Sequence, residues 1–427
     1  MVEVAPLPPL DEHSLFVFWC QLLVVLGVAR AGGFLARRLG MPRVIGELLA
    51  GVALGPSLLG QVWPNAFEWL FPADERQAGL LLGLAWIGIV FLLGITGAEI
   101  DMSSIRRQGR AATTATIGSL IIPLSVGAAV GSQLPGRFLG ESSRWVFVMF
   151  FAVAFAISSL PVAARILGDL GLMERPVAHL ALGVATVNDI VGWLLLGVVV
   201  GVAESGAIEV GRLFTAIMVV TITTVLVLRF GPRVLDRTAA EMERRSGGPA
   251  AEVSLLVLTI VAVGAVTHAV GIEVVIGAFI AGIAIGGSRL RHSVGFGALE
   301  SVTNGIFAPL FFAIAGIRVD LTELASPTVA VWAIVITVAA TAAKLIGAYG
   351  GGRAGGLGRR DSIGLGATLN ARGALEIVVA TVGRSLDVIG PTAYTVIVVM
   401  ALVTTALTGP MLQLIYRRRP SPEELAS

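Results

Sequence analysis

Thirteen apolar runs, each near the length of a membrane-spanning helix, alternate along the chain with short clusters of arginine, proline and glycine. A helix needs about twenty apolar residues to cross the hydrocarbon core of a bilayer. The runs cover about 15–36, 42–60, 79–98, 111–133, 145–167, 177–203, 210–232, 252–270, 272–288, 299–317, 327–349, 361–383 and 391–416. This pattern predicts an all-α polytopic membrane protein with about thirteen transmembrane helices, numbered 1 to 13 in this order.

Arginine is distributed unequally between the loops on the two sides of these helices. With the N-terminus outside, the cytoplasmic loops hold twenty-one arginines and the opposite loops hold six. Basic residues accumulate in cytoplasmic loops. We therefore expect a multi-pass cell-membrane protein with its N-terminus outside and its C-terminus in the cytoplasm. The chain stops soon after Arg419, so we expect one transmembrane domain over residues 1–427 and no regulatory domain.

The composition excludes other classes of protein. The chain is 56% hydrophobic and only 14% charged, unlike any soluble globular domain. A single cysteine, Cys20, excludes an internal disulfide, and the sequence shows no Cys/His cluster and no enzyme signature. We expect no enzymatic activity, no cofactor and no nucleic-acid partner.

An internal repeat relates helix 2 to helix 9. Residues 44–55 and 275–286 are identical at seven of twelve positions, and residues 97–101 after helix 3 resemble residues 316–320 after helix 10. The paired helices are seven apart, which is an odd number, so the two halves must cross the membrane in opposite directions. The sequence predicts an inverted repeat with helix 7, about 210–232, as its linker.

Helices 5 and 12 both contain residues that interrupt a helix, and they too are seven apart. Helix 5 carries Ser158-Ser159-Leu160-Pro161 at its centre, and helix 12 carries Asn370-Ala371-Arg372-Gly373. Proline removes a backbone donor, and unwound backbone exposes carbonyls and half-helix ends that can coordinate a cation. We predict that both helices are discontinuous; a simple proline kink is the alternative for helix 5.

Helix 6 carries Asn188 and Asp189 near its midpoint. An isolated aspartate at that depth either binds a proton or stays ionised beside a cation. Those are the two states that an exchanger requires. The alternative is a purely structural ion pair between Asp189 and Lys344.

Lys344 is the only lysine of the chain and lies inside helix 11. An amine can lose its proton whereas a guanidinium effectively cannot, and a charge at this depth indicates transport. The alternative is a lysine whose amine reaches an interface.

Arg372 and Glu376, four apart on helix 12, predict an ion pair. Glu47 is expected to pair with Arg43 or, as a second choice, to line an ion path.

Together these motifs resemble the monovalent cation/proton antiporter superfamily, in particular its Kef-type potassium/proton and plant cation/proton exchanger branch. The resemblance rests on Gly46–Gly51, Ser158–Arg165, Asn188-Asp189, Pro309–Phe312, Lys344 and Asn370–Glu376. It implies a homodimer with a scaffold of helices 1–3 and 8–10, about 15–98 and 252–317. A moving core would contain helices 4–6 and 11–13, about 111–203 and 327–416, with helices 5 and 12 crossing at their breaks.

The resemblance also implies residue roles. Asp189 would be the shared site for H⁺ and for Na⁺ or K⁺, oriented by Asn188, while backbone near Ser158 and Ser159 completes the cation shell. Asparagine before this aspartate is typical of electroneutral members, so we expect one-for-one exchange by elevator-type alternating access. Lys344, with Arg372 and Glu376, would supply the electrostatics of the core. The alternatives are a potassium efflux channel and a sodium-coupled organic-anion symporter.

Overall fold

The structure is a computed structural model that describes residues 11–39, 41–100, 109–205, 210–244, 248–270 and 274–416. In these ranges, eleven helices are long and apolar enough to cross a membrane. The shorter apolar helix Val274–Gly286 and the interrupted pair Arg359–Leu369 and Ala374–Ser385 occupy the two remaining predicted spans. All thirteen predicted spans are therefore helical, and the predicted all-α fold is confirmed.

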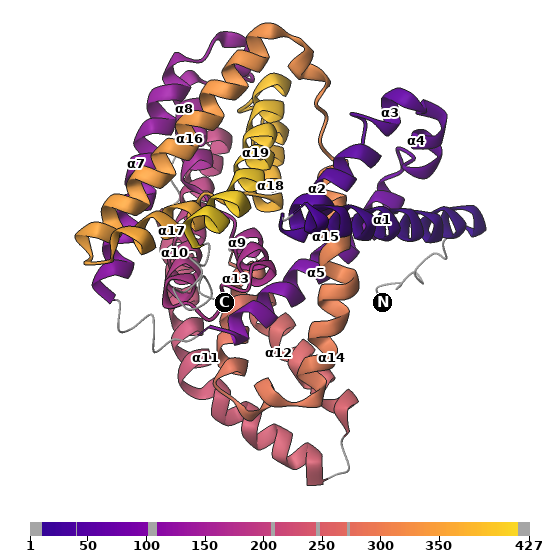
Figure 1. The fold of residues 1–427 in the computed structure, drawn as a ribbon, viewed down its shortest axis with the longest axis vertical. Helices are drawn as coiled ribbons and strands as arrows, with labels where there is room; N and C mark the ends of the chain where they lie inside the picture. Colours follow the sequence, from indigo (N-terminus) through magenta and orange to yellow (C-terminus); the bar gives the residue numbers. More distant parts are fainter. Residues whose placement is uncertain are drawn as a thin grey trace, which may run out of the picture.

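The helices are numbered as in Figure 1. They are α1 (Glu12–Arg38), α2 (Arg43–Leu54), α3 (Leu59–Val62), α4 (Pro64–Leu70), α5 (Glu75–Ala98), α7 (Gly109–Gln133), α8 (Arg144–Ala156), α9 (Leu160–Asp169), α10 (Pro176–Ser205), α11 (Val210–Arg244), α12 (Pro249–His268), α13 (Val274–Gly286), α14 (Val294–Val302), α15 (Ala308–Ile317), α16 (Pro327–Ala354), α17 (Arg359–Leu369), α18 (Ala374–Ser385) and α19 (Pro391–Tyr416). A π-helical segment, η3 (Thr303–Phe307), joins α14 to α15.

Large apolar side chains cover much of the outer surface. On α1, Trp19 and Leu23 are 61% and 76% exposed, and on α11 Phe214 and Val225 are 64% and 59% exposed. In water such a surface would associate, whereas lipid tails are as apolar as these side chains. The chain is a multi-pass membrane protein.

Glycine contacts show that the sequence repeat is also a repeat in space. α2 packs on α15 where Gly51 meets the carbonyl oxygen of Ala313, and α13 packs on α5 where Gly282 meets that of Gly94. In the sequence repeat, Gly51 corresponds to Gly282 and Ala313 to Gly94. A Cβ atom at either glycine would overlap the partner backbone, so glycine allows both helix pairs to approach closely.

Two helices related by the repeat cross each other at a glycine from each. Gly118 of α7 and Gly347 of α16 each face the carbonyl oxygen of the other. The two helices of such a pair are related by a two-fold axis. Where they cross at that axis, corresponding positions of the two helices contact each other. The contacts of the two halves therefore fit the predicted inverted repeat.

Both predicted breaks are present and lie against each other. The first separates α8 from α9 at residues 157–159, and the second separates α17 from α18 at residues 370–373. The Ser159 amide donates a hydrogen bond to the Ala371 carbonyl oxygen at 2.9 Å, which joins the two breaks. Pro161 lies in the first turn of α9, where backbone N–H groups have no acceptor within the helix, so the missing N–H of proline removes no helical hydrogen bond. Helix 5 is thus discontinuous, and the kink reading is wrong.

The helices pack in two groups that meet at the interrupted helices. α7 packs on α8 and α16, and α19 packs on α16, α17 and α18. In the other group α1 and α2 pack on α15, and α5 and α12 pack on α13. Figure 1 shows the first group at the upper left, the second at the right and below, and α11 along the lower edge. α9 contacts α2 and α5, so it reaches from one group to the other.

Candidate functional site

Asp189 lies on α10, directly beside the start of half-helix α9. Its side chain is 2% exposed, and its Oδ2 atom accepts a hydrogen bond from the Leu160 amide at 3.4 Å. Leu160 is the first residue of α9, and the amino end of a helix carries a partial positive charge. The carboxylate is therefore held by backbone, while its Oδ1 atom has no hydrogen-bond partner in the protein.

The other three residues predicted to bind cation and proton lie next to this carboxylate in the fold. Ser158 and Ser159 form the break that ends at Leu160, and Asn188 precedes Asp189 on α10. The Asn188 Nδ2 atom donates to Ser119 Oγ of α7 at 2.9 Å, which leaves Asn188 Oδ1 without a partner. The hydroxyl groups of Ser158 and Ser159 are likewise buried and unpartnered.

Unpartnered buried polar atoms are rare in proteins because they lose their water without a replacement. Here two hydroxyls, one amide oxygen and one carboxylate oxygen occur on adjoining residues. Carboxylate and neutral oxygens are the ligands that alkali cations take in place of their hydration shell. The donor set fits a monovalent cation or a proton on Asp189. The sequence did not identify Ser119 as a site residue, because one serine in a helix rich in small residues does not stand out in the sequence.

Lys344 does not pair with Asp189 and does not reach an interface. Its side chain is 0% exposed, and its Nζ atom donates to the carbonyl oxygens of Ala156 at 2.5 Å and Ser119 at 3.1 Å. Ala156 is the last residue of α8, where helix carbonyls have no partner and carry partial negative charge. The role at an interface is therefore wrong, and Lys344 interacts with Asp189 only through longer-range attraction and not through a direct contact.

Arg372, in the second break, binds the same end of α8. Its Nη1 and Nη2 atoms donate to the carbonyl oxygens of Ala154 and Phe155, each at 2.6 Å. Nη1 also lies 2.7 Å from Glu376 Oε1, and both side chains of this pair are buried. The predicted ion pair is present, but its arginine also caps half-helix α8, which the sequence did not indicate. Two cationic side chains thus neutralise the negative end of α8.

Threonines of α19 hold the second break in place. The Thr405 hydroxyl contacts both the amide and the carbonyl of Arg372, and Asn370 Nδ2 donates to the Thr404 carbonyl oxygen at 3.4 Å. Sequence reasoning did not single out these threonines. Their signal was a pair of adjacent polar residues inside an otherwise apolar run.

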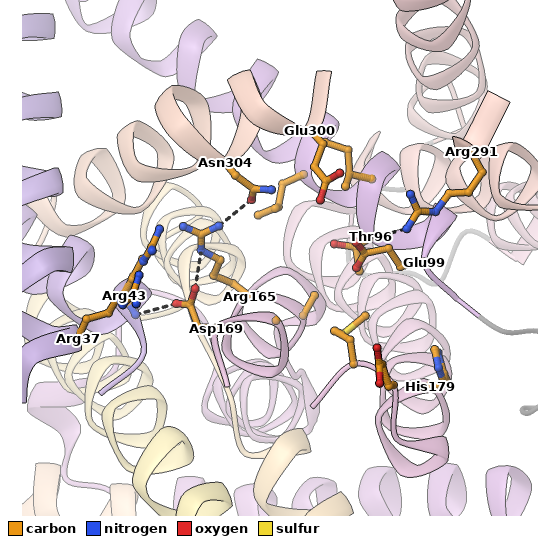
Figure 2. A pocket seen from close by; sticks show the side chains of 16 residues that line it. Arg37, Arg43, Thr96, Glu99, Arg165, Asp169, His179, Arg291, Glu300 and Asn304 are labelled. Carbon is orange, nitrogen blue, oxygen red and sulfur yellow. Dashed lines mark hydrogen bonds and ion pairs between the residues drawn. The ribbon is translucent and has the colours of Figure 1, made fainter. Parts of the chain in front are cut away.

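A cavity of about 810 Å³ lies against the later part of α9, and Asp189 is not among its lining residues. Its lining includes charged residues of both signs from α1, α2, α9, η2 (Arg289–His292) and α14, together with Glu99 just after α5. The cavity reaches the exposed residues Arg37 and Glu174. Figure 2 shows Arg165 and Asp169 on one side of it and Glu99, Arg291 and His179 on the other. The cavity opens on the side that the arginine distribution predicts to be cytoplasmic. Its lining residue Ala164 is one helical turn from Leu160.

Charges inside this cavity are partly paired. Glu99 follows the end of α5, and its carboxylate lies 3.8 Å from Arg291. Burial raises the pKa of the Glu99 carboxyl above its ordinary value, the nearby Glu300 raises it further, and Arg291 opposes both. Glu47 does not pair with Arg43, as we had expected, but with Arg165 at 3.4 Å.

An inverted repeat in which two interrupted helices cross beside a buried carboxylate is the architecture of a secondary ion transporter. Residues 23–418 match the family described as sodium/hydrogen exchanger, transmembrane. The chain belongs to the sodium/hydrogen exchanger family, which confirms the resemblance drawn from its motifs.

Relatives cover nearly the whole chain. It is 31% identical over 411 residues to cation/H(+) antiporter 15 of Arabidopsis thaliana, covering 96% of this chain and 49% of the plant protein. It is 29% identical over 418 residues to Na(+)/H(+) antiporter NhaS4 of Synechocystis sp., covering 97% of this chain and 100% of NhaS4. K(+)/H(+) antiporter 1 of Saccharomyces cerevisiae is 30% identical over 94% of this chain and 46% of its own length. The chain spans about half the length of the plant and yeast relatives.

Among solved structures, the sodium proton antiporter MjNhaP1 of Methanocaldococcus jannaschii has the same fold. The TM-score is 0.64 over 94% of this chain and 96% of that chain, with 16% sequence identity. This similarity supports the fold.

Proposed function

We propose that this protein exchanges a monovalent cation for H⁺ across the membrane, with the two ions competing for Asp189. The observation that carries the proposal is the set of unpartnered oxygens on Ser158, Ser159, Asn188 and Asp189 at the start of α9. A bare carboxylate is costly to move through low-dielectric surroundings. The core would therefore cross only when a cation or a proton neutralises Asp189.

Several named relatives support exchange as the activity. Their names specify Na(+)/H(+) exchange in one case and K(+)/H(+) exchange in another. Sodium and potassium are both possible cargo, since one carboxylate and several neutral oxygens can coordinate either ion. Exchange needs no cofactor, and its substrates are the two ions.

We propose an electroneutral cycle because one carboxylate serves both ions. Residue 188 is asparagine, and its amide nitrogen is bound to Ser119. Lys344 is bound to the Ala156 carbonyl oxygen at the end of α8 and to the Ser119 carbonyl oxygen of α7, so its charge is already matched by a helix end and a second carbonyl. One cation inward for one proton outward, or the reverse, then leaves the net charge unchanged.

We further propose that the two packing groups are a scaffold and a moving core. The scaffold would contain helices 1–3 and 8–10, through which two copies form a homodimer, and the core would contain helices 4–6 and 11–13. α11, the linker of the repeat, packs on α12 and α13 of the scaffold group. Both broken helices would move with the core, carrying Asp189 between the two sides of the membrane.

The two alternatives lack a comparable observation. An organic-anion symporter needs a free cationic side chain at its site, yet Lys344 and Arg372 both donate to carbonyl oxygens of α8. A channel needs a continuous path, yet Asp189 is not among the residues that line the large inner cavity. Exchange is the function that this geometry supports best.

The test is cation-driven proton movement in proteoliposomes with a trapped pH dye. Sodium, potassium and lithium are compared for the wild type, Asp189→Asn and a control, Asp387→Asn, whose side chain is 60% exposed in an ion pair with Arg384. We expect a saturable pH change that is lost only with Asp189→Asn. Conductance far above carrier turnover would favour a channel, and sodium-dependent uptake of labelled organic acids would favour a symporter.

A further inference from the structure

Half-helix α9 carries polar contacts at both ends. Its first amide binds Asp189, and one and a half turns later Arg165 reaches out of the core group. Arg165 Nη1 donates to Asn304 Oδ1 at 2.7 Å, and Nη2 donates to Glu47 Oε1 at 3.4 Å. Asn304 lies in the π-helical segment η3 and Glu47 lies in α2, so both acceptors belong to the scaffold group.

A second contact joins the last residue of α9 to the same scaffold helix. Asp169 Oδ2 accepts a hydrogen bond from the Arg43 amide at 2.7 Å, at the start of α2. Asp169 Oδ1 also lies 3.9 Å from Arg165 Nε, which steadies the guanidinium. Figure 2 shows this chain of contacts from Asn304 through Arg165 and Asp169 to Arg43. We call these four residues and Glu47 the inner latch.

The inner latch has no polar counterpart on the opposite side of the described structure. The repeat relates α9 to α18, and α18 meets α5 and α15 around a cavity of about 240 Å³. That cavity is lined mainly by apolar side chains, among them Trp86, Phe311 and Ile377. Its charged lining residue, Arg318, forms no ion pair with α18 among the described residues, and the hydroxyl of its polar lining residue, Thr381, donates within α18 to the Ile377 carbonyl oxygen. Charged and hydrogen-bonded contacts on one side only must bias a two-state equilibrium toward the state in which they are made.

Burial makes the inner latch sensitive to the position of the core. Glu47 is 1% exposed and Arg165 is 8% exposed, and each has one polar atom without a hydrogen-bond partner. Separating a buried ion pair leaves two uncompensated charges, which is costly unless water reaches them. Arg165 and Asp169 both line the 810 Å³ cavity, so water can enter when the contacts break.

We propose that Arg165 is a positioning residue of the transport cycle: the inner latch holds α9 against the scaffold while the inner cavity is open and releases it when the core moves outward. This inference rests on the proposed exchange by a moving core. It assigns Arg165 and Glu47 a role in setting the ratio of inward-open to outward-open protein, rather than in binding the transported ion.

The test is the accessibility of the inner cavity to a membrane-impermeant maleimide. The reporter is Met173→Cys, a cavity-lining position, in a Cys20→Ser background, labelled in vesicles whose cytoplasmic face is outward. Arg165→Gln and Glu47→Gln should slow labelling at least about fivefold, the lower range of energetic coupling between distant sites. Arg165→Lys should restore much of the rate, and the double variant should be no slower than either single variant.

The matched control is Arg291→Gln, which removes an ion pair on the same cavity between two scaffold elements. Its labelling should equal that of the unsubstituted reporter protein. Asn304→Ala, which removes only a neutral acceptor, gives a milder second variant if Arg165→Gln does not fold. Unchanged labelling in folded Arg165→Gln and Asn304→Ala dimers, or an equal change in Arg291→Gln, would overturn the proposal. If the wild type exchanges ions while labelling is unaffected, the latch is wrong and the exchange function stands.

Discussion

Lys344 and Ala156 are joined by a hydrogen bond of 2.5 Å at the point where half-helix α8 ends. The single lysine of the chain is thereby placed at the negative end of a helix, while Asp189 lies at the positive end of the next half-helix, α9. The broken helix thus separates the buried amine of Lys344 from the carboxylate that we propose to titrate. This separation explains how the lysine is buried without forming a direct ion pair with Asp189.

Replacing Lys344 by methionine should destabilise the protein. The change removes two charge-assisted hydrogen bonds, each worth about 1.5–3 kcal/mol, although relief of the buried charge offsets part of the loss. We expect a clearly lower melting temperature in detergent. The control is Thr341→Val, one turn away on α16, where a buried hydroxyl without a partner is replaced by a methyl group. A melting temperature for Lys344→Met equal to that of Thr341→Val would contradict the cap on α8.

The Arg372–Glu376 pair should behave differently from a simple buried ion pair. Arg372→Met leaves Glu376 uncompensated and should cost about 3–5 kcal/mol. If the two side chains interacted only with each other, the double variant Arg372→Met with Glu376→Met would regain the lost stability. Here the double variant should recover only part of the lost free energy of unfolding, because the carbonyl oxygens of Ala154 and Phe155 also lose their donor. Thermal unfolding of both single variants and the double variant measures this; full recovery would show that the bonds to α8 contribute nothing.

Asn188→Asp should make transport sensitive to membrane voltage. The change places a second carboxylate beside Asp189, near the carbonyl oxygen of Ser119 that Lys344 binds. If Lys344 turns to the new carboxylate, an additional charge moves in each cycle. The wild type should be unaffected by a valinomycin-clamped potential, whereas the variant should respond to it. A voltage response of the wild type would contradict electroneutral exchange.

The repeat predicts equal penalties at two distant glycines. Gly51→Ala and Gly282→Ala should both severely reduce the amount of folded protein, since each added methyl group overlaps a helix backbone. Gly79→Ala, with open space at the same atom, should stabilise α5 by about 0.5–1 kcal/mol. Fluorescence-detected gel filtration of tagged variants compares the three. If Gly51→Ala or Gly282→Ala gave a normal amount of folded protein, the close approach of the helices at that glycine would not be required.

Much of this fold could be predicted from local pattern. Spans follow from apolar length, the repeat from residues 44–55 and 275–286, and the breaks from residues that cannot continue a helix. Arg372 and Glu376 were predictable as a pair because their spacing on one helix fixes their geometry.

Contacts between distant segments were not predictable in this way. Nothing near Lys344 in the sequence identifies the Ala156 carbonyl as its partner, 188 residues away. Glu47 was assigned to Arg43 because the two are one turn apart, yet the packing of α9 on α2 brings Arg165 to it. A partner supplied by another helix depends on how the helices cross, and a single sequence does not determine that crossing.

The central claim is that cation and proton compete for one carboxylate, and equilibrium binding of a radioactive cation to the purified protein tests it most directly. Binding of ²²Na⁺ or ⁸⁶Rb⁺ is measured across a range of pH for the wild type, Asp189→Asn and Asp387→Asn. The account predicts that the apparent Kd rises tenfold for each unit fall in pH below the titration of the site, with the same limiting capacity. It also predicts that only Asp189→Asn abolishes binding. Affinity independent of pH, or binding that survives in Asp189→Asn, would contradict it.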